Sequence, residues 1–177
     1  MKYVFTDISQ IAHLWANKLQ ESARNSGNYY FNGDSIYSYG SHFMIAKHHT
    51  NKDGKEIVLF TTRSYSVTTS KQIGVTRQAC SHKELIYCKN PDGYSHTENF
   101  NNWTSLIENS AKSLVNARKP EKYLNEISGY FSQAEQYATY FGLSLPEGLI
   151  LANSITNKAD YIEFENKKKE LAIATEK

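Results

Sequence analysis

Hydrophobic and polar residues follow two different periods in the two parts of this chain. In the first part, short runs rich in Tyr, Phe, Ile and Val are separated by turn residues, a pattern typical of β-strands. From Glu98 onward, apolar residues recur with the helical period of about 3.6 residues. The pattern predicts an α+β fold in which an N-terminal helix and a sheet precede a group of helices.

The first element is predicted to be a helix from about Ile8 to Asn25. Asp7 with Gln10 three residues later is a variant of the capping box, and apolar residues follow at helical spacing. The sequence NSG at 25–27 supplies a stop signal for this helix.

Two turn sequences predict an antiparallel meander. NGD at 32–34 and DG at 53–54 are hairpin signals flanked by strand-forming runs. We expect a short helix capped by Thr69 or Ser70 after the meander, and then one more strand. The expected strands lie near 28–32, 35–39, 42–49, 57–63 and 84–90.

Three helices are predicted to close the chain. The first covers 102–117, the second runs from Pro120 to Gly142, and the third begins at Pro146. The change of period near residue 95 separates an α+β sheet domain from a helical extension that packs on it, and we expect the two to form one compact unit. Their expected ranges are 1–95 and 96–177.

Composition narrows the class of protein. The 177 residues are 40% hydrophobic and include 13 tyrosines, so the chain is long and apolar enough to bury a core. No run has the length of a signal peptide or of a membrane span, and we therefore expect a cytoplasmic protein. The charge is uneven, because residues 1–119 carry 14 Lys and Arg against 9 Asp and Glu, whereas residues 120–177 carry 6 against 9.

Metal and cofactor chemistry find no support in the motifs. Cys80 and Cys88 lie eight residues apart without a CxxC pair, and His42, His48 and His49 are not spaced to share one ion on a strand. Phosphate-binding glycine motifs, a nucleophile elbow and a paired His-x-Thr motif are also absent from the sequence. We therefore expect neither a metal ion nor a cofactor.

The run TTRSYSVTTSK at 61–71 is the candidate binding segment. It groups hydroxyls with a guanidinium and an ammonium near an expected helix start, and such groups satisfy phosphate oxygens. The alternative is that Thr and Ser serve only as strand and N-cap residues here. The candidate contacts to a nucleic acid or a partner are Arg63, Ser66, Thr69, Ser70, Lys71, Arg77, Tyr37, Tyr39, Tyr65 and His42.

Two segments together resemble a known domain family. IYSYGSHFMIA at 36–46 and TTRSYSVTTSKQ at 61–72 resemble a family of unknown function associated with bacteriophages and mobile elements. The likeness covers about the first half of the chain. It implies a small accessory protein of a phage or a related element, a setting in which inhibitors of CRISPR effector nucleases are one class of protein.

The sequence thus favours a non-enzymatic phage or mobile-element protein that binds DNA or a nucleic-acid-guided host defence complex, as an anti-CRISPR inhibitor does. One alternative is an enzyme acting on a nucleotide or nucleic acid, with His42 beside the hydroxyl cluster. Another is a structural phage component that forms homo-oligomers through its C-terminal helices. The expected partners are nucleic acid or a host nucleoprotein complex, and no membrane.

Overall fold

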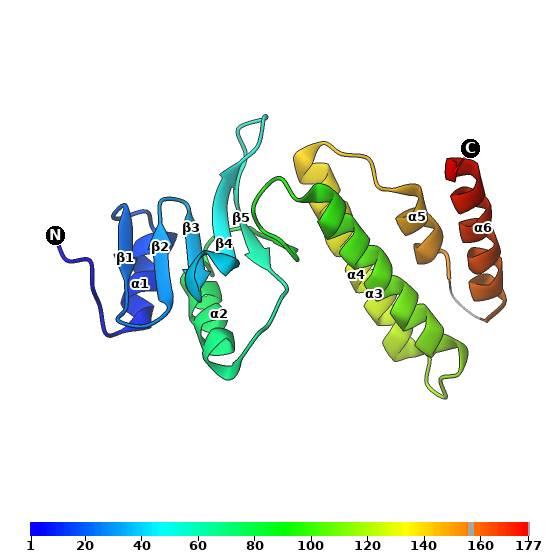
Figure 1. Ribbon diagram of the computed structural model, residues 1–177, viewed down its shortest axis with the longest axis horizontal. Helices are drawn as coiled ribbons and strands as arrows, with labels where there is room; N and C mark the ends of the chain where they lie inside the picture. The colour runs from blue at the N-terminus through cyan, green and yellow to red at the C-terminus, as the bar shows by residue number, and fades with distance from the viewer. Residues whose placement is uncertain (156–157, 177) are drawn as a thin grey trace. The chain divides into compact units, whose positions relative to one another are not determined.

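The computed structural model describes residues 1–155 and 158–176. The chain divides into two compact units, unit 1 (Met1–His96) and unit 2 (Thr97–Lys177). Unit 1 combines a sheet with two helices, and unit 2 is helical (Figure 1). The α+β class predicted from the sequence is therefore confirmed.

The sheet has six strands, and their order in space is their order in the chain. Neighbouring strands are antiparallel except the last two, which are parallel because a helix crosses over between them. The predicted meander is confirmed, and a first strand that the sequence did not reveal extends it. The strands are β1 (Ser22–Arg24), β2 (Tyr29–Asn32), β3 (Ser35–Ser38), β4 (Phe43–Thr50), β5 (Glu56–Thr61) and β6 (Leu85–Cys88).

Two helices, α1 (Ile8–Ala16) and α2 (Val67–Ala79), lie against the same face of this sheet (Figure 1). Trp15 of α1 and Ile73 of α2 join alternate strand residues in one apolar core. Because side chains alternate across a strand, residues such as Tyr29 and Phe31 point into this core while their neighbours point away from it. We call the helix-covered side the inner face and the opposite side the outer face.

The first helix ends at Ala16, and the predicted extension to Asn25 is wrong. Lys18 adopts a left-handed conformation with φ of 54°, and the N–H of Leu19 donates to the carbonyl of Leu14 at 2.9 Å. These are features of a Schellman motif, which usually has glycine where this chain has lysine. A lysine at this position is not a stop signal that can be recognised in the sequence. The chain after it leads into β1.

The inserted helix α2 begins earlier than predicted, because Ser66 and not Thr69 or Ser70 is its N-cap. Ser66 has extended backbone angles, and its side chain accepts the N–H of Thr69 at 3.1 Å. This is the usual geometry of a serine cap. The loop that carries Arg63 therefore leads directly into the helix.

Unit 2 contains four helices in its described residues, where the sequence predicted three. The run that begins after Pro146 is two helices, because α5 ends at Asn153. The backbone N–H and the hydroxyl of Ser154 both donate to the carbonyl of Leu151 at this end. Serine and asparagine compete for backbone hydrogen bonds and favour such helix ends. The helices are α3 (His96–Val115), α4 (Glu121–Phe141), α5 (Glu147–Asn153) and α6 (Lys158–Glu176).

Helices α3 and α4 form an antiparallel pair. As the residue number rises along α3, the number of its partner on α4 falls, and both Trp103 and Phe100 contact the ring of Tyr137. The buried aromatic rings and the polar pairs together fix the register of the two helices. Side-chain hydrogen bonds also join them, among them Asn99 to Tyr137, Trp103 to Gln133 and Ser110 to Glu126.

One buried histidine joins the sheet to α1. The Nε2–H of His48 donates to the carbonyl of Trp15 at 2.9 Å, and the two rings lie 4.3 Å apart. The Nδ1 atom is buried without a hydrogen-bond partner. Burial lowers the pKa of His48, with Lys18 adding to the effect, so the folded protein favours the neutral ring.

This burial predicts a dependence of stability on pH. Because the pKa of His48 is lower in the folded than in the unfolded state, the unfolded state takes up the proton first. The free energy of unfolding should fall as the pH drops from about 7 through the ordinary histidine pKa of about 6.5. Urea unfolding of His48→Gln, whose amide can still donate to Trp15, should show a shallower fall.

The exposed His13 provides a control for the replacement of a histidine by glutamine, because His13→Gln leaves the buried ring of His48 in place. The pKa of His49 is also lowered by burial, so part of the dependence remains in both variants. An unchanged pH dependence in His48→Gln would contradict the role given to His48.

Candidate functional site

The candidate site lies at one end of the sheet, where β3 and β5 end and β4 begins. Ser38 pairs with Phe43 at this end, and Arg63 follows the last residue of β5 by two positions. A pocket of about 400 Å³ opens there. Its lining residues are Tyr39, Phe43, Arg63, Ser64 and Tyr65.

Tyr39 enters the pocket because the chain reverses at an unusual turn. Tyr39 has φ of 56° and Gly40 has φ of 70°, so two consecutive residues are left-handed. Tyr39 lies between β3 and the short helix η1 (Gly40–His42), and Gly40 is the first residue of η1. This conformation is strained for a residue with a side chain. The turn holds because the N–H of Tyr39 donates to the carbonyl of Asn28 at 2.8 Å.

The aromatic wall of the pocket consists of Tyr39, Phe43 and Tyr65. The ring of Tyr65 meets that of Tyr39 edge to face at 5.4 Å and lies 6.4 Å from that of Phe43. Phe43 is buried, Tyr39 is 39% exposed and Tyr65 is 73% exposed. This aromatic wall therefore extends from the core to the solvent, and the ring of Tyr65 is its most exposed part.

Arg63 is the cation of this pocket. Its guanidinium carbon lies 4.6 Å from the centre of the Phe43 ring, and its backbone N–H donates to the Thr61 hydroxyl at 3.1 Å. The Nε atom is buried and has no hydrogen-bond partner. Partial burial lowers the pKa of Arg63 from its ordinary value, but an arginine stays charged at neutral pH.

No carboxylate neutralises Arg63 through direct contact. Among the described residues none lies within ion-pair distance of it. Asp92 is close enough to favour the charged form of Arg63, yet its oxygens accept the N–H groups of Tyr94 and Ser95 and the Ser95 hydroxyl. The guanidinium is thus left with a buried donor that points to no internal acceptor.

The predicted hydroxyl cluster is partly occupied by internal hydrogen bonds. Thr69 is buried and contacts the hydroxyls of Ser66 and Ser38, and Ser38 donates to the side-chain oxygen of Gln72 at 2.6 Å. The Tyr39 hydroxyl lies 3.4 Å from that of Ser66. Ser66 and Thr69 therefore connect the pocket wall to α2 and have little capacity left for a ligand.

The remaining predicted residues are spread over unit 1. Ser70 and Lys71 are exposed on α2, and the guanidinium of Arg77 lies 5.0 Å from the centre of the Phe60 ring. Tyr37 stacks against Tyr30 on the outer face. The side chain of His42 lies outside what the structure describes, so its part in any site stays a prediction.

The structure thus brings together Tyr39, Arg63 and Tyr65, with Ser66 at the border. Sequence reasoning missed Phe43 and Ser64 as members of the pocket. Phe43 could have been found from its place directly after the Gly40 turn, since the first residue of a returning strand pairs with the last residue of the strand before it. Ser64 is distinguished only by its position between two lining residues.

No protein-family model, curated protein or solved structure matches this chain. Within the described part of the chain, no three His, Cys, Asp or Glu side chains gather as a metal site would require. Over the same residues, none of the helices combines the length and the apolar character needed to cross a membrane. The interpretation of the site therefore depends on its own geometry.

The internal hydrogen bonds predict different roles for two serines of the candidate segment. Ser66→Ala should lower the free energy of unfolding by about 1 kcal/mol, because it removes the N-cap of α2. Ser70→Ala lies on the exposed side of the same helix and should change stability by less than about 0.5 kcal/mol. Chemical denaturation of both variants measures the difference, and equal values would contradict the assigned cap.

Proposed function

We propose that this protein is a non-enzymatic nucleic-acid-binding protein that holds a backbone phosphate at Arg63 and a base at Tyr65. The observation that carries the proposal is a half-buried guanidinium, that of Arg63, which lines a pocket open to solvent and has no ion-pair partner among the described residues. A guanidinium without a carboxylate partner can form charge-assisted hydrogen bonds to phosphate oxygens.

The aromatic wall supports a nucleic acid over a free phosphate. Tyr65 is 73% exposed and lies in the same pocket as the cation, so a ligand that bonds Arg63 also meets a π-face. Every nucleotide carries a phosphate and a base on the same sugar. Nucleic-acid-binding proteins therefore combine cations with aromatic side chains. The ring of Tyr39 packs edge to face against the ring of Tyr65.

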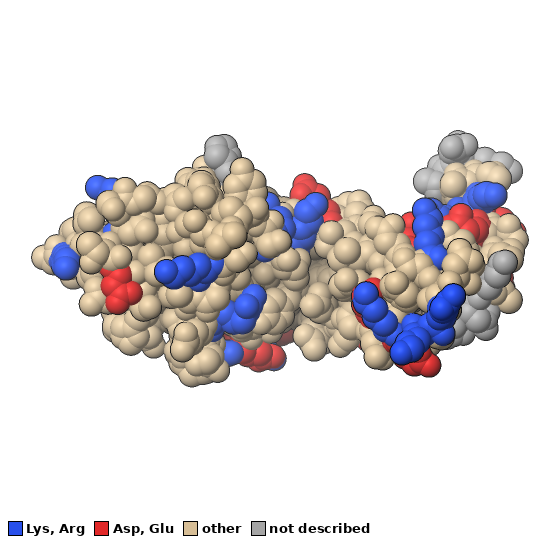
Figure 2. Space-filling model, turned by 90° about the horizontal axis from the view of Figure 1, so that it is seen from below, with Lys and Arg blue, Asp and Glu red and all other residues tan. Residues whose placement is uncertain are grey.

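The charge of unit 1 is consistent with a polyanionic partner. Residues 1–96 hold 11 Lys and Arg against 7 Asp and Glu, and residues 97–177 hold 9 against 11. In the left part of Figure 2, which shows unit 1, the Lys and Arg side chains are separated by neutral residues. The proposal therefore depends on individual contacts and less on a broad positive field.

The resemblance to a phage and mobile-element domain family suggests where such binding would act. In that setting we propose that the bound nucleic acid belongs to a nucleic-acid-guided defence complex, and that the protein inhibits the effector nuclease as anti-CRISPR proteins do. A guide-loaded complex offers both single strands and exposed phosphates. Its inhibition by this protein would be measured as loss of target cleavage.

Substitutions of Arg63 test the proposed phosphate contact. Arg63→Ala should weaken binding of a short labelled DNA by about tenfold or more, because it removes a charge-assisted hydrogen bond. Arg63→Lys keeps the charge but lacks the planar fork, so it should recover only part of the affinity. Fluorescence anisotropy over a series of salt concentrations measures both the affinity and its salt dependence.

Arg118 provides the matched control for these variants, because it is an exposed arginine in unit 2. Arg118→Ala should leave the affinity within about twofold of the wild type. Thermal unfolding of each variant separates lost binding from lost folding, since Arg63 also packs on Phe43. Equal affinities of Arg63→Ala and Arg118→Ala would reject the pocket as the binding site.

Two tyrosines of almost equal exposure test the proposed base contact. Tyr65 is 73% exposed and Tyr94 is 76% exposed, so replacing either with Ala should cost little stability. Only Tyr65→Ala should weaken binding, by about fivefold or more, since one base stacked on an aromatic ring contributes about 1–3 kcal/mol. The same anisotropy titration applies, and similar losses in the two variants would indicate nonspecific binding.

A further inference from the structure

A row of side chains crosses the outer face of the sheet. Arg24 of β1 pairs with Tyr30 of β2, Tyr30 with Tyr37 of β3, and Tyr37 with Met44 of β4. These four residues alternate with core residues, so they share the face opposite α1 and α2. With neighbouring strands about 4.8 Å apart, the row is roughly 14 Å long.

The two tyrosines at the centre of the row form a stacked pair. The ring centres of Tyr30 and Tyr37 lie 5.1 Å apart, with an angle of 19° between the ring planes. Both side chains are half-buried, and Arg24 beside them is exposed. The pair therefore forms an ordered stack of two rings on a face that no helix of unit 1 covers.

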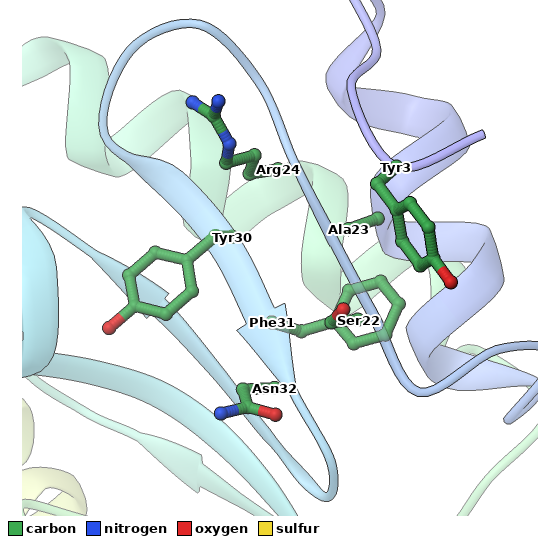
Figure 3. Close-up of a pocket in the computed structure, with 7 residues that line it drawn as sticks. All are labelled: Tyr3, Ser22, Ala23, Arg24, Tyr30, Phe31 and Asn32. Carbon is green, nitrogen blue, oxygen red and sulfur yellow. The ribbon is translucent and has the colours of Figure 1, made fainter.

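The rest of this face differs in the two halves of the sheet. Over β4 and β5 the loop after β6 covers it, because Lys47 donates to the carbonyl of Asp92 at 3.1 Å and Gly93 lies against the ring of His49. Along β1 and β2 a pocket of about 300 Å³ is lined by outer-face residues such as Arg24 and Tyr30 and also by Ala23 and Phe31 of the inner face. Figure 3 shows Arg24 and Tyr30 extending to the same side of these strands.

The open half of the outer face is neither acidic nor purely apolar, and this chemistry fits a nucleic acid. The outward positions of β1, β2 and β3 carry Ser, Arg, Tyr and Asn residues, and none of them is a carboxylate. A cation beside a stacked aromatic pair matches a phosphate beside stacked bases. Tyr37 also lies only two residues before Tyr39, so this row and the Arg63 pocket are adjacent along the chain.

We infer that the outer face binds single-stranded nucleic acid, with bases extending the Tyr30–Tyr37 stack and a phosphate at Arg24. This inference rests on the proposed function and adds its substrate class. Bases in a duplex are already stacked on each other, so only an unpaired strand can offer their faces to the tyrosines. In RNA-binding domains with an open sheet, aromatic side chains on the sheet stack two or three bases.

The test compares an oligothymidylate with a duplex of the same length, titrated against the full chain. The wild type should bind the single strand at least about tenfold more tightly than the duplex. Tyr30→Leu and Tyr37→Leu should each weaken single-strand binding by about fivefold or more, because one stacking face is lost. Met44→Leu, in the same row but without an aromatic ring, should bind like the wild type.

A second measurement covers the case in which these half-buried tyrosines are needed for folding. Ultraviolet crosslinking of a bromouracil-containing oligonucleotide to the wild type should join it to Tyr30 or Tyr37, and fragmentation in the mass spectrometer identifies the crosslinked residue and separates it from Tyr39 on the same peptide. Crosslinks only elsewhere would overturn the inference, as would equal affinity for duplex and single strand.

The results also separate this inference from the proposed function. If the leucine variants bind like the wild type while Arg63→Ala binds weakly, the outer face is excluded and the Arg63 pocket stands. If the wild type binds neither form of DNA, both are excluded.

Discussion

A set of hydrogen bonds between α2 and the first strands of the meander holds the Arg63 pocket in place at the end of the sheet. The Tyr29 hydroxyl meets that of Thr76 at 2.7 Å, Ser38 donates to Gln72 at 2.6 Å, and Gln72 donates to the side chain of Asn28 at 2.8 Å. A helix held only by apolar contacts can rotate or slide, whereas buried polar groups must keep their partners. These bonds fix the start of α2, and with it the loop from Arg63 to Ser66.

The two surfaces that we assign to nucleic acid depend on this arrangement in different ways. The Arg63 pocket lies at the end of the sheet, where the left-handed Tyr39 and the α2 loop meet. The outer-face row depends on the strand register alone, since Arg24, Tyr30 and Tyr37 are consecutive cross-strand partners. A strand of nucleic acid bound to both would pass from the open face around the end of the sheet.

Much of this fold could be predicted from local sequence patterns. The hairpin at Gly33, where φ is 61°, and the capping of α1 by Asp7 both follow from short-range rules and are confirmed. The end of α1 at Ala16 could not be predicted, because the left-handed residue that follows it is a lysine, Lys18, and not a glycine. The unpaired donor of Arg63 was equally invisible, since it depends on Phe43 and on the loop of Asp92, both distant in the chain. The sequence therefore indicated a segment that lines the pocket but not the contacts that Arg63 makes there.

The central claim is that the guanidinium of Arg63 donates to a phosphate, and nuclear magnetic resonance tests it directly. The chain has only four arginines, Arg24, Arg63, Arg77 and Arg118, so their side-chain N–H signals can be assigned by substitution. On titration with an oligothymidylate, the account predicts a large downfield shift of the Arg63 Nε–H signal and none for Arg118. An Arg63 signal that stays in place while the protein is saturated with DNA would contradict the account.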